Sequence, residues 1–471
     1  MKILPSLALL VLFLPVAMQG QAAPKKKTSP AGATRATRAK VRHREVVQTG
    51  MRTFSMYNGM KVTLIHSGTE RKAVVALALG TGQIDEPDFG PGLATLTAAV
   101  LLEGTIARSS AQITTEASSF GSGIDANVGA VSTSLSGEVR TEHIARFVSL
   151  LSDVVRHPRL DTAGFEKVRR HSMTVLDTTT QDPGHRARQQ WRALVFPDHP
   201  FGRPYTYPST LTALQLGHVR NIYDDNFGAA RAHLYVSGVF EDAAVDRAVR
   251  DAFSDWKAGA PAVSHSSSPV SRRQFMLVDV PGASQSTIWV GLPVIDPSNA
   301  DFVKLEIANA LLGGPVSSRA VAALGDEDRL PAASSSTLWR RKGASYWLNV
   351  AQVPGDSTGV ALDLLFAQID RLRQAPPAES DLARVKQDVI DRFNTLRGSR
   401  LGMVEEMMYV DEFGFGELWH ADYVQQVMAV SADDVRQTAV SQLDPEHMTI
   451  TVVGDRASIE PLVARFRPAL P

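Results

Sequence analysis

Cysteine is absent from the 471 residues of this chain. A chain without thiols forms no disulfide and has neither a cysteine nucleophile nor a thiolate metal site. Charge of one sign is not in excess either, because 49 basic residues balance 49 acidic ones. No net positive charge is available to attract a polyanion. Thiol chemistry is therefore excluded, and we expect no nucleic-acid partner.

Nucleotide-binding and serine-hydrolase motifs are missing as well. The sequence contains no G-x-S-x-G, no G-x-x-x-x-G-K-[ST] and no G-x-G-x-x-G. These motifs would indicate a nucleophilic serine, a phosphate-binding loop and a dinucleotide fold. The 12 histidines are scattered, and none forms a pair at a spacing typical of metal ligands. We therefore expect no bound metal and no cofactor.

The N-terminus carries one long apolar run. Lys2 precedes the apolar residues 3–18, and the small residues Gly20 and Ala22 follow them. This order is typical of a cleaved secretory signal, so residues 1–22 are predicted to be a signal peptide. An uncleaved membrane anchor is the alternative, but the run is short for a spanning helix and contains two prolines. An exported chain without cysteine fits a bacterial periplasm, with no membrane span after cleavage.

A basic segment rich in small residues and threonine occupies positions 23–46. It has no apolar period, so it is predicted to be a disordered arm. Its role is either that of a solubilising tether or that of a contact with anionic lipid or an acidic partner. Scattered charges without aromatic neighbours favour the tether.

The rest of the chain repeats itself. HVRNIYDDNFGAARAHLYVSG at 218–238 matches DVRQTAVSQLDPEHMTITVVG at 434–454 without a gap. Each segment has the pattern of a helix, a turn, an alternating apolar strand and a terminal glycine. LLEGT at 101–105 has a counterpart in LLGGP at 311–315. Self-similarity of this kind predicts two copies of one structural unit.

Each copy combines alternating strands with helical segments, which predicts an α+β fold. The strands lie close together in the sequence, as antiparallel neighbours do. Each half is therefore predicted to be an antiparallel-rich β-sheet with helices packed on one face. The predicted domains are residues 47–255 and 273–471, and a Ser/Pro/Ala-rich linker at 256–272 joins them.

Several segments, taken in order, resemble the pitrilysin or insulinase family of zinc peptidases, the inverzincins, from about Met51 to the C-terminus. They are TGQIDEPDFGPGLATLTAAVLLEGT, RFVSLLSDVVRHPRLDTAGFEKVRR, FPDHPFGRPY, LLGGPVSSR and VSADDVRQTAVSQLDPEHMTITVVGD. The resemblance implies a clam of two halves that enclose a peptide substrate.

Active members of that family carry H-x-x-E-H on the helix before an L-x-G-T turn. Two histidines four residues apart bind zinc, and the glutamate activates the bound water. Counted back from the LLEGT turn, these positions hold Thr95, Ala98 and Ala99. The third ligand of the family would fall near residues 174–176, where the nearest carboxylate is Asp177. The resemblance therefore implies a family member without its zinc site.

The second half also departs from the family. Members often carry an arginine and a tyrosine in R-G-L-A-Y, which help to bind the substrate backbone and stabilise the tetrahedral intermediate. The corresponding positions here hold Asp328 and Ala332. Arg329 lies one residue away and is a candidate substrate-binding residue, although its side chain would point differently.

Substrate binding in the family uses an edge strand near the zinc helix, which takes up peptide by strand addition. The matching segment here is GIDANVGAVSTS. Asp125, Asn127 and Gly129 are therefore candidate substrate-binding residues. The equally weighted alternative is an ordinary strand of the sheet.

Methionine and aromatic residues are concentrated at 402–424, among them Met403, Met407, Phe413 and Trp419. Helical spacing of the methionines predicts packing in a core. A soft surface for a partner or an apolar peptide is the alternative, which the glycines around Phe413 and Phe415 favour.

These observations lead to one functional hypothesis and two alternatives. We expect a non-catalytic subunit of a periplasmic zinc metallopeptidase, which completes the chamber and helps to bind peptide for a catalytic partner chain carrying H-x-x-E-H. One alternative is a stand-alone peptide-binding or scaffold protein with an inactive peptidase fold. The other is an active zinc endopeptidase, which would require ligands that the sequence lacks.

Overall fold

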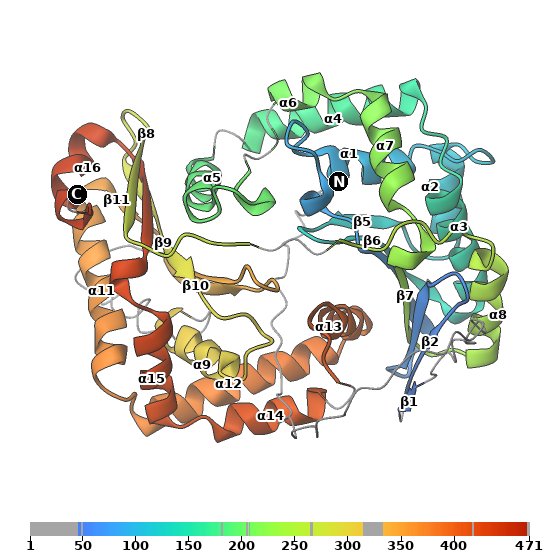
Figure 1. The fold of residues 1–471 in the computed structure, drawn as a ribbon. Coiled ribbons are helices and arrows are strands. Elements are labelled where there is room, and N and C mark those ends of the chain that lie inside the picture. The colour runs from blue at the N-terminus through green and yellow to red at the C-terminus, as the bar shows by residue number, and fades with distance from the viewer. Residues whose placement is uncertain are drawn as a thin grey trace, which may run out of the picture.

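The computed structural model describes residues 46–48, 50–179, 182–203, 206, 208–263, 267–313, 333–416 and 419–468. The predicted signal peptide and the predicted arm up to residue 45 lie outside this part of the chain. Strand β1 (Val46–Gln48) begins at the last residue of the predicted arm. Two α+β halves follow, and they face each other in the folded molecule (Figure 1).

The first half is built on a seven-stranded sheet. After β1 its strands are β2 (Met51–Ser55), β3 (Lys61–His66), β4 (Lys72–Leu79), β5 (Asp125–Val128), β6 (Thr133–Arg140) and β7 (Ala232–Gly238). Their order across the sheet is β1-β2-β3-β7-β4-β6-β5. β3 and β7 run parallel, and the other neighbours are antiparallel.

The second half has a five-stranded sheet made of β8 (Gln274–Asp279), β9 (Gln285–Pro293), β10 (Ala333–Trp339), β11 (Tyr346–Pro354) and β12 (Thr449–Gly454). Read from β8, the order β8-β12-β9-β11-β10 matches β3-β7-β4-β6-β5 of the first sheet. The single parallel pair, β8 with β12, occupies the same place as β3 with β7. The predicted duplication of an antiparallel-rich α+β unit is confirmed.

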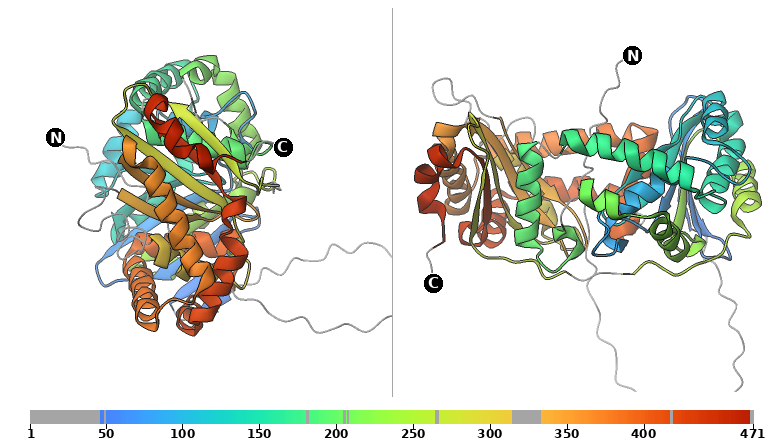
Figure 2. Two further views of the ribbon diagram at one scale, coloured as in Figure 1. Left: turned by 90° about the vertical axis from the view of Figure 1, so that its left-hand side faces the viewer. Right: turned by 90° about the horizontal axis from the view of Figure 1, so that it is seen from above.

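The helices of the two halves lie mainly, but not all, on the outer faces of the sheets (Figures 1 and 2). Those of the first half are α1 (Leu93–Leu101), α2 (Ser110–Ser119), α3 (Ile144–Arg156), α4 (Thr162–Thr179), α5 (Pro183–Val195), α6 (Pro208–Ala213), α7 (Leu216–Asn226) and α8 (Asp242–Phe253). Those of the second half are α9 (Phe302–Gly313), α11 (Thr358–Gln374), α12 (Glu379–Arg397), α13 (Arg400–Phe413), α14 (Trp419–Ala429), α15 (Ala432–Gln442) and α16 (Arg456–Val463).

Local sequence explains these helices and where they begin. α3 buries Phe147, Leu151 and Val154 on one face, at the spacing of a helix that packs on a sheet. α2 begins after Ser109, whose hydroxyl accepts from the Gln112 N–H while the Gln112 side chain returns to the Ser109 N–H. This reciprocal pair satisfies two backbone donors that a helix start leaves open. The first half therefore has local helix signals as well as an apolar interior.

Each half lends one helix to the other (Figures 1 and 2). α5 of the first half packs on β8, β9 and β12 of the second sheet, and α13 of the second half packs on β4 and β7 of the first. Trp191 of α5 is fully buried, and its indole N–H donates to the Thr449 carbonyl at 3.0 Å. Val404 of α13 is buried against Tyr235 and its neighbours. The predicted helices on one face are present, and an exchanged helix covers part of the opposite face.

The segment that joins the halves starts inside the first core. Trp256 is buried, and its ring lies 5.6 Å from that of Phe253. The Ala229 and Ala230 N–H groups donate to the carbonyls of residues 257 and 258. The first residues of the predicted linker are thus packed against the first half.

The aromatic residues near the end of α13 lie in the second core. Phe413 and Trp419 are buried, and Phe415 is half-buried and stacks on both rings. The prediction of core packing is confirmed for these residues. The alternative of an exposed partner surface is wrong here, because the rings pack on one another and on Tyr409.

Candidate functional site

One face of α1 corresponds to the zinc-binding face of the family that the sequence resembles. This face has no side chain that could bind zinc or act as a base. Thr95, Ala98 and Ala99 share this face because they lie at positions i, i+3 and i+4 of α1. Thr95 is exposed, Ala98 is buried and Ala99 is half-buried. Neither methyl group offers a lone pair to a metal, and neither is a base for water. Only the Thr95 hydroxyl remains as a polar group.

The N-terminus of α1 is closed by a glutamate that the sequence analysis missed. The Glu86 carboxylate accepts from the Gly92 N–H at 3.1 Å and from the Ala94 N–H at 2.8 Å. Burial raises the pKa of Glu86 to about 7, although these two hydrogen bonds favour the ionised form. The Arg203 guanidinium donates to the Glu86 carbonyl and pairs with Asp88 at 2.6 Å. Glu86 therefore anchors the helix start and is not positioned at the Thr95 face.

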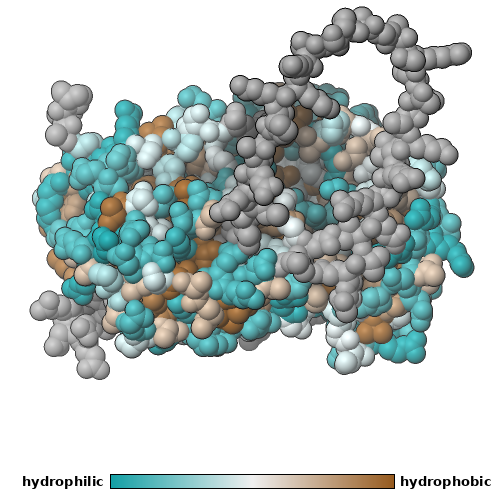
Figure 3. All heavy atoms as spheres, turned by 60° about the horizontal axis from the view of Figure 1, so that its bottom comes forward, coloured by the Kyte–Doolittle hydropathy of each residue, from teal (hydrophilic) through white to brown (hydrophobic). Residues whose placement is uncertain are grey.

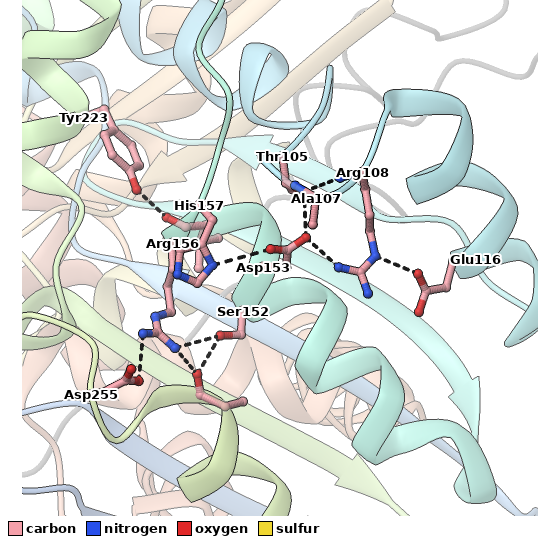
Figure 4. A network of polar contacts seen from close by, with 12 residues as sticks. Thr105, Ala107, Arg108, Glu116, Ser152, Asp153, Arg156, His157, Tyr223 and Asp255 are labelled. Carbon is pink, nitrogen blue, oxygen red and sulfur yellow. Dashed lines mark hydrogen bonds and ion pairs between the residues drawn. The ribbon is translucent and has the colours of Figure 1, made fainter.

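A polar network holds the turn that follows α1 (Figure 4). The Thr105 hydroxyl donates to Asp153 of α3 at 2.7 Å and accepts from the Arg108 N–H at 2.9 Å. The Arg108 guanidinium contacts Asp153 at 2.7 Å and Glu116 at 2.8 Å. Gly104 has a φ of +147°, where L side chains are rare, and a Cβ there would lie 3.0 Å from the backbone carbonyl oxygen of Arg108. The Gly-Thr pair is thus required by the architecture of the turn.

The helix expected to bring a third ligand does pack against α1, and the described α4 residues that share a core with Ala99 are apolar. α4 contacts α1, and its Met173 and Leu176 pack on the same core as Ala99. Thr174 is exposed and donates to the Arg170 carbonyl. The side chain of Asp177 lies outside the described part of the chain. Among the described residues no group of three His, Cys, Asp or Glu side chains could hold a metal ion.

The predicted peptide-binding strand is β5, at the edge of the first sheet and beside α1. Asp125 and Asn127 are exposed, and β5 pairs only with β6 within the described ranges. Gly129 follows β5 in a turn, where its N–H donates to the Ser132 carbonyl and its carbonyl accepts from Gln83. The outer edge of β5 is therefore accessible for pairing with a peptide as far as the described residues show, whereas the N–H and carbonyl of Gly129 already form hydrogen bonds within the chain.

Three predicted positions of the second half fall outside the description. Asp328, Arg329 and Ala332 lie between the end of α9 at Gly313 and the start of β10 at Ala333, within the undescribed range 314–332.

A buried ion pair in the second half also escaped the sequence analysis. Glu306 of α9 and Arg340 are 2% and 3% exposed and lie in contact. Burial raises the pKa of Glu306 to about 7, and the nearby Arg340 and Arg392 oppose the rise. The only sequence signal is an acidic residue inside the apolar helix FVKLEIANALLG. The pair lies inside the core and connects α9 to the end of β10, so we interpret it as part of the packing of the second half.

A cluster of polar side chains connects the first half to α13 of the second half. Tyr235 of β7 donates to Asp411 of α13 at 2.6 Å, and His233 lies 3.1 Å from the same carboxylate. The other nitrogen of His233 is 2.8 Å from the Thr63 hydroxyl. Burial opposes ionisation of Asp411, but the hydrogen bonds from His233 and Tyr235 lower its pKa below the usual value. These contacts bind α13 to the first sheet.

The face of the molecule drawn in Figure 3 is mixed in polarity. On the face in Figure 3, hydrophobic residues are scattered among hydrophilic ones over the part that the described residues form. Single exposed apolar residues are normal for soluble domains. Within the described ranges, no helix is both long and apolar enough to cross a membrane.

Comparison with known proteins places this architecture. The family model "Insulinase (Peptidase family M16)" matches residues 61–209, and "Peptidase M16 inactive domain" matches residues 213–389. Together the two models span more than half of the chain. No curated protein matches the sequence.

Solved structures share the fold at low sequence identity. A peptidase M16 inactive domain from Pseudomonas fluorescens is 16% identical with a TM-score of 0.78, covering 86% of this chain and 98% of that one. A protease from Helicobacter pylori is 15% identical with a TM-score of 0.80, covering 88% of this chain and 99% of that one. The resemblance inferred from the sequence is confirmed. The chain belongs to the M16 peptidase family, that of pitrilysin and insulinase, and residues 213–389 match the domain of this family that is described as inactive.

Proposed function

We propose that the chain is a non-catalytic subunit of a periplasmic zinc metallopeptidase of this family. One contrast carries the proposal. The supports of α1 are intact, with Glu86 at its start and the Thr105 network at its end. The positions between them hold Thr95, Ala98 and Ala99. A scaffold kept without its ligands and its base is suited to binding rather than to hydrolysis.

The binding role that this scaffold supports best is the capture of extended peptide at β5. The outer edge of β5 lies beside α1 and forms no strand pair with any other described strand. Strand addition uses such groups for affinity and leaves side-chain contacts for specificity. Asp125 and Asn127, whose side chains are exposed, are the residues that would flank the peptide.

A catalytic partner would supply what this chain lacks. Peptide hydrolysis by a zinc enzyme needs three protein ligands for the metal and a base for the bound water. The described side chains of α1 and α4 do not form such a group. A second chain of the same family, carrying H-x-x-E-H, would complete the chamber. The exposed β5 edge also supports the alternative of a stand-alone peptide-binding protein.

Affinity capture of the tagged chain from its native periplasm, at native expression and low salt, tests the partnership. We expect a second family member that contains H-x-x-E-H, recovered in a constant ratio and detected by mass spectrometry. Mature protein beginning near residue 23 would support export through the predicted signal. Recovery of the chain by itself would favour the stand-alone binding protein.

Peptide capture at β5 is tested with two adjacent proline substitutions and a fluorescein-labelled unstructured peptide. Successive residues of a strand direct their N–H groups to opposite sides, so Ala126→Pro and Asn127→Pro remove one outward donor and one donor to β6. The variant that loses the outward donor should lose peptide binding with the smaller loss of stability. Unchanged peptide binding in both variants would exclude strand addition at this edge.

A further inference from the structure

A cavity of about 290 Å³ lies between α7 and the segment that leads from β4 into α1. That segment includes a short 3₁₀ turn at Gln83–Asp85. On the α7 side the cavity is lined by His218, Asn221, Ile222 and Asp225, which share one helical face. The volume is at the lower end of the range for small-molecule sites, so one side chain or one small organic molecule would fill it.

The cavity has an apolar wall and an aromatic mouth. Leu93 and Ile222 line it and are buried. Phe89 also lines it but is 59% exposed, and its ring lies 5.0 Å from the His218 ring. A large exposed ring beside an apolar wall is a surface on which a ligand stem can pack, and its face attracts a cation.

The charge of the lining is negative. Asp85 is neutralised inside the protein, because it pairs with the buried Arg231 at 2.9 Å and accepts from the Gly82 N–H. Asp225 is exposed and forms no ion pair with any residue in the described part of the chain. The lining formed by the described residues includes no lysine or arginine. One uncompensated carboxylate is therefore presented to an occupant.

We propose that this cavity binds an organic cation with a short apolar stem, an alkylammonium or alkylguanidinium group. The stem packs on Leu93 and Ile222, Phe89 covers it, and the charged end pairs with Asp225. An anion would meet the Asp225 carboxylate without a cation to offset it. A neutral alcohol of the same size would make the apolar contacts alone.

The cavity lies close to the end of the edge strand. The Gln83 and Ile84 N–H groups donate to the carbonyls of Gly129 and Ala130, in the turn after β5. A basic residue of an extended peptide on β5 is thus one source of the cation, and a free amine is the other. The inference itself does not require the proposed function, because the cavity is formed by this chain alone.

The test uses n-butylamine as the probe and n-butanol as its neutral counterpart, with binding measured by saturation-transfer NMR on the purified chain. Asp225→Asn removes the carboxylate that lines the cavity. Asp224→Asn removes the same charge from the neighbouring exposed residue, which lies outside the lining, and serves as the matched control. Both substitutions are at exposed positions of α7, so an unchanged melting temperature checks that the fold is kept.

We expect Asp225→Asn to weaken butylamine binding about five- to tenfold, as the loss of a partly exposed charged contact does. Asp224→Asn should change it less than about twofold, because screening weakens more distant charges. Equal affinity for butanol and butylamine, equal effects of the two substitutions, or no saturable binding of butylamine would overturn the proposal. Lysine blocked at both its amino and carboxyl ends separates the sources, since its binding indicates a peptide side chain and its exclusion indicates a free amine.

Discussion

Replacing Trp191 by alanine should destabilise the protein through the contact between its halves. Trp191 belongs to α5 of the first half, yet it is fully buried against the second sheet, with its ring 4.8 Å from that of Tyr346. Removal of a buried tryptophan costs about 3–5 kcal/mol. The lost hydrogen bond to Thr449 adds about 1 kcal/mol and leaves a buried carbonyl with one partner fewer. We expect a loss of about 4–6 kcal/mol in the free energy of unfolding.

Urea unfolding followed by circular dichroism measures this loss, and hydrogen exchange along α5 locates it. Trp191→Phe is the graded control, because it keeps an aromatic ring and removes only the N–H donor and part of the volume. That variant should lose about 1–2 kcal/mol. A loss below about 2 kcal/mol for Trp191→Ala, with unchanged exchange in α5, would refute the view that this helix is docked on the second half.

Three further predictions follow from the site and from the termini. Combining Thr95→His, Ala98→Glu and Ala99→His should not create chelator-sensitive peptidase activity in a peptide-cleavage assay, because the described residues of α4 that pack on the core beside Ala99 include no carboxylate or imidazole. Removing residues 23–45 should leave the melting temperature nearly unchanged if the prediction of a disordered arm from its sequence is right, because such an arm buries little apolar surface, and a fall of many degrees would show that the arm packs on the fold. The pKa of Glu86 is about 7 in the folded state and 4.5 in the unfolded state. Protonation of Glu86 therefore stabilises the fold below pH 4.5, and this stabilisation is lost as pH rises through about 7. Urea unfolding should show that Glu86→Gln becomes more stable relative to the parent as pH rises from 4.5 to 7. A difference in the free energy of unfolding that stays constant over this range would contradict the raised pKa of Glu86.

Local patterns were enough to predict the repeated unit and the place of α1. The match between residues 218–238 and 434–454 corresponds to α7 with β7 and to α15 with β12, at equivalent places of the two sheets. The LLEGT turn fixed the register of Thr95, Ala98 and Ala99 on one face of α1. Periodicity and turn residues are local properties, so a single sequence carries them.

The exchange of helices between the halves could not be predicted in this way. The apolar face of α5 indicates that Trp191 is buried, but hydrophobic burial is not directional and does not say against which sheet. The same holds for α13 and its buried Val404. Contacts across such distances in sequence depend on the topology of the whole chain.

Polar contacts at long range were missed for a related reason. Glu86 closes the start of α1 from a position before the helix that lies outside the short spacing of an N-terminal capping box. The contact of Tyr235 with Asp411 joins residues 176 positions apart. Neither has a sequence pattern of its own, whereas the absence of histidine and glutamate from α1 could be read from the sequence directly.

The central claim is that this family member does not catalyse hydrolysis by itself. The direct test combines metal analysis of the purified chain with cleavage of an unstructured peptide, in the presence and absence of a chelator. We predict less than stoichiometric zinc and no cleavage above the buffer control. Chelator-sensitive cleavage that elutes together with the chain, at a constant specific activity, would contradict the claim.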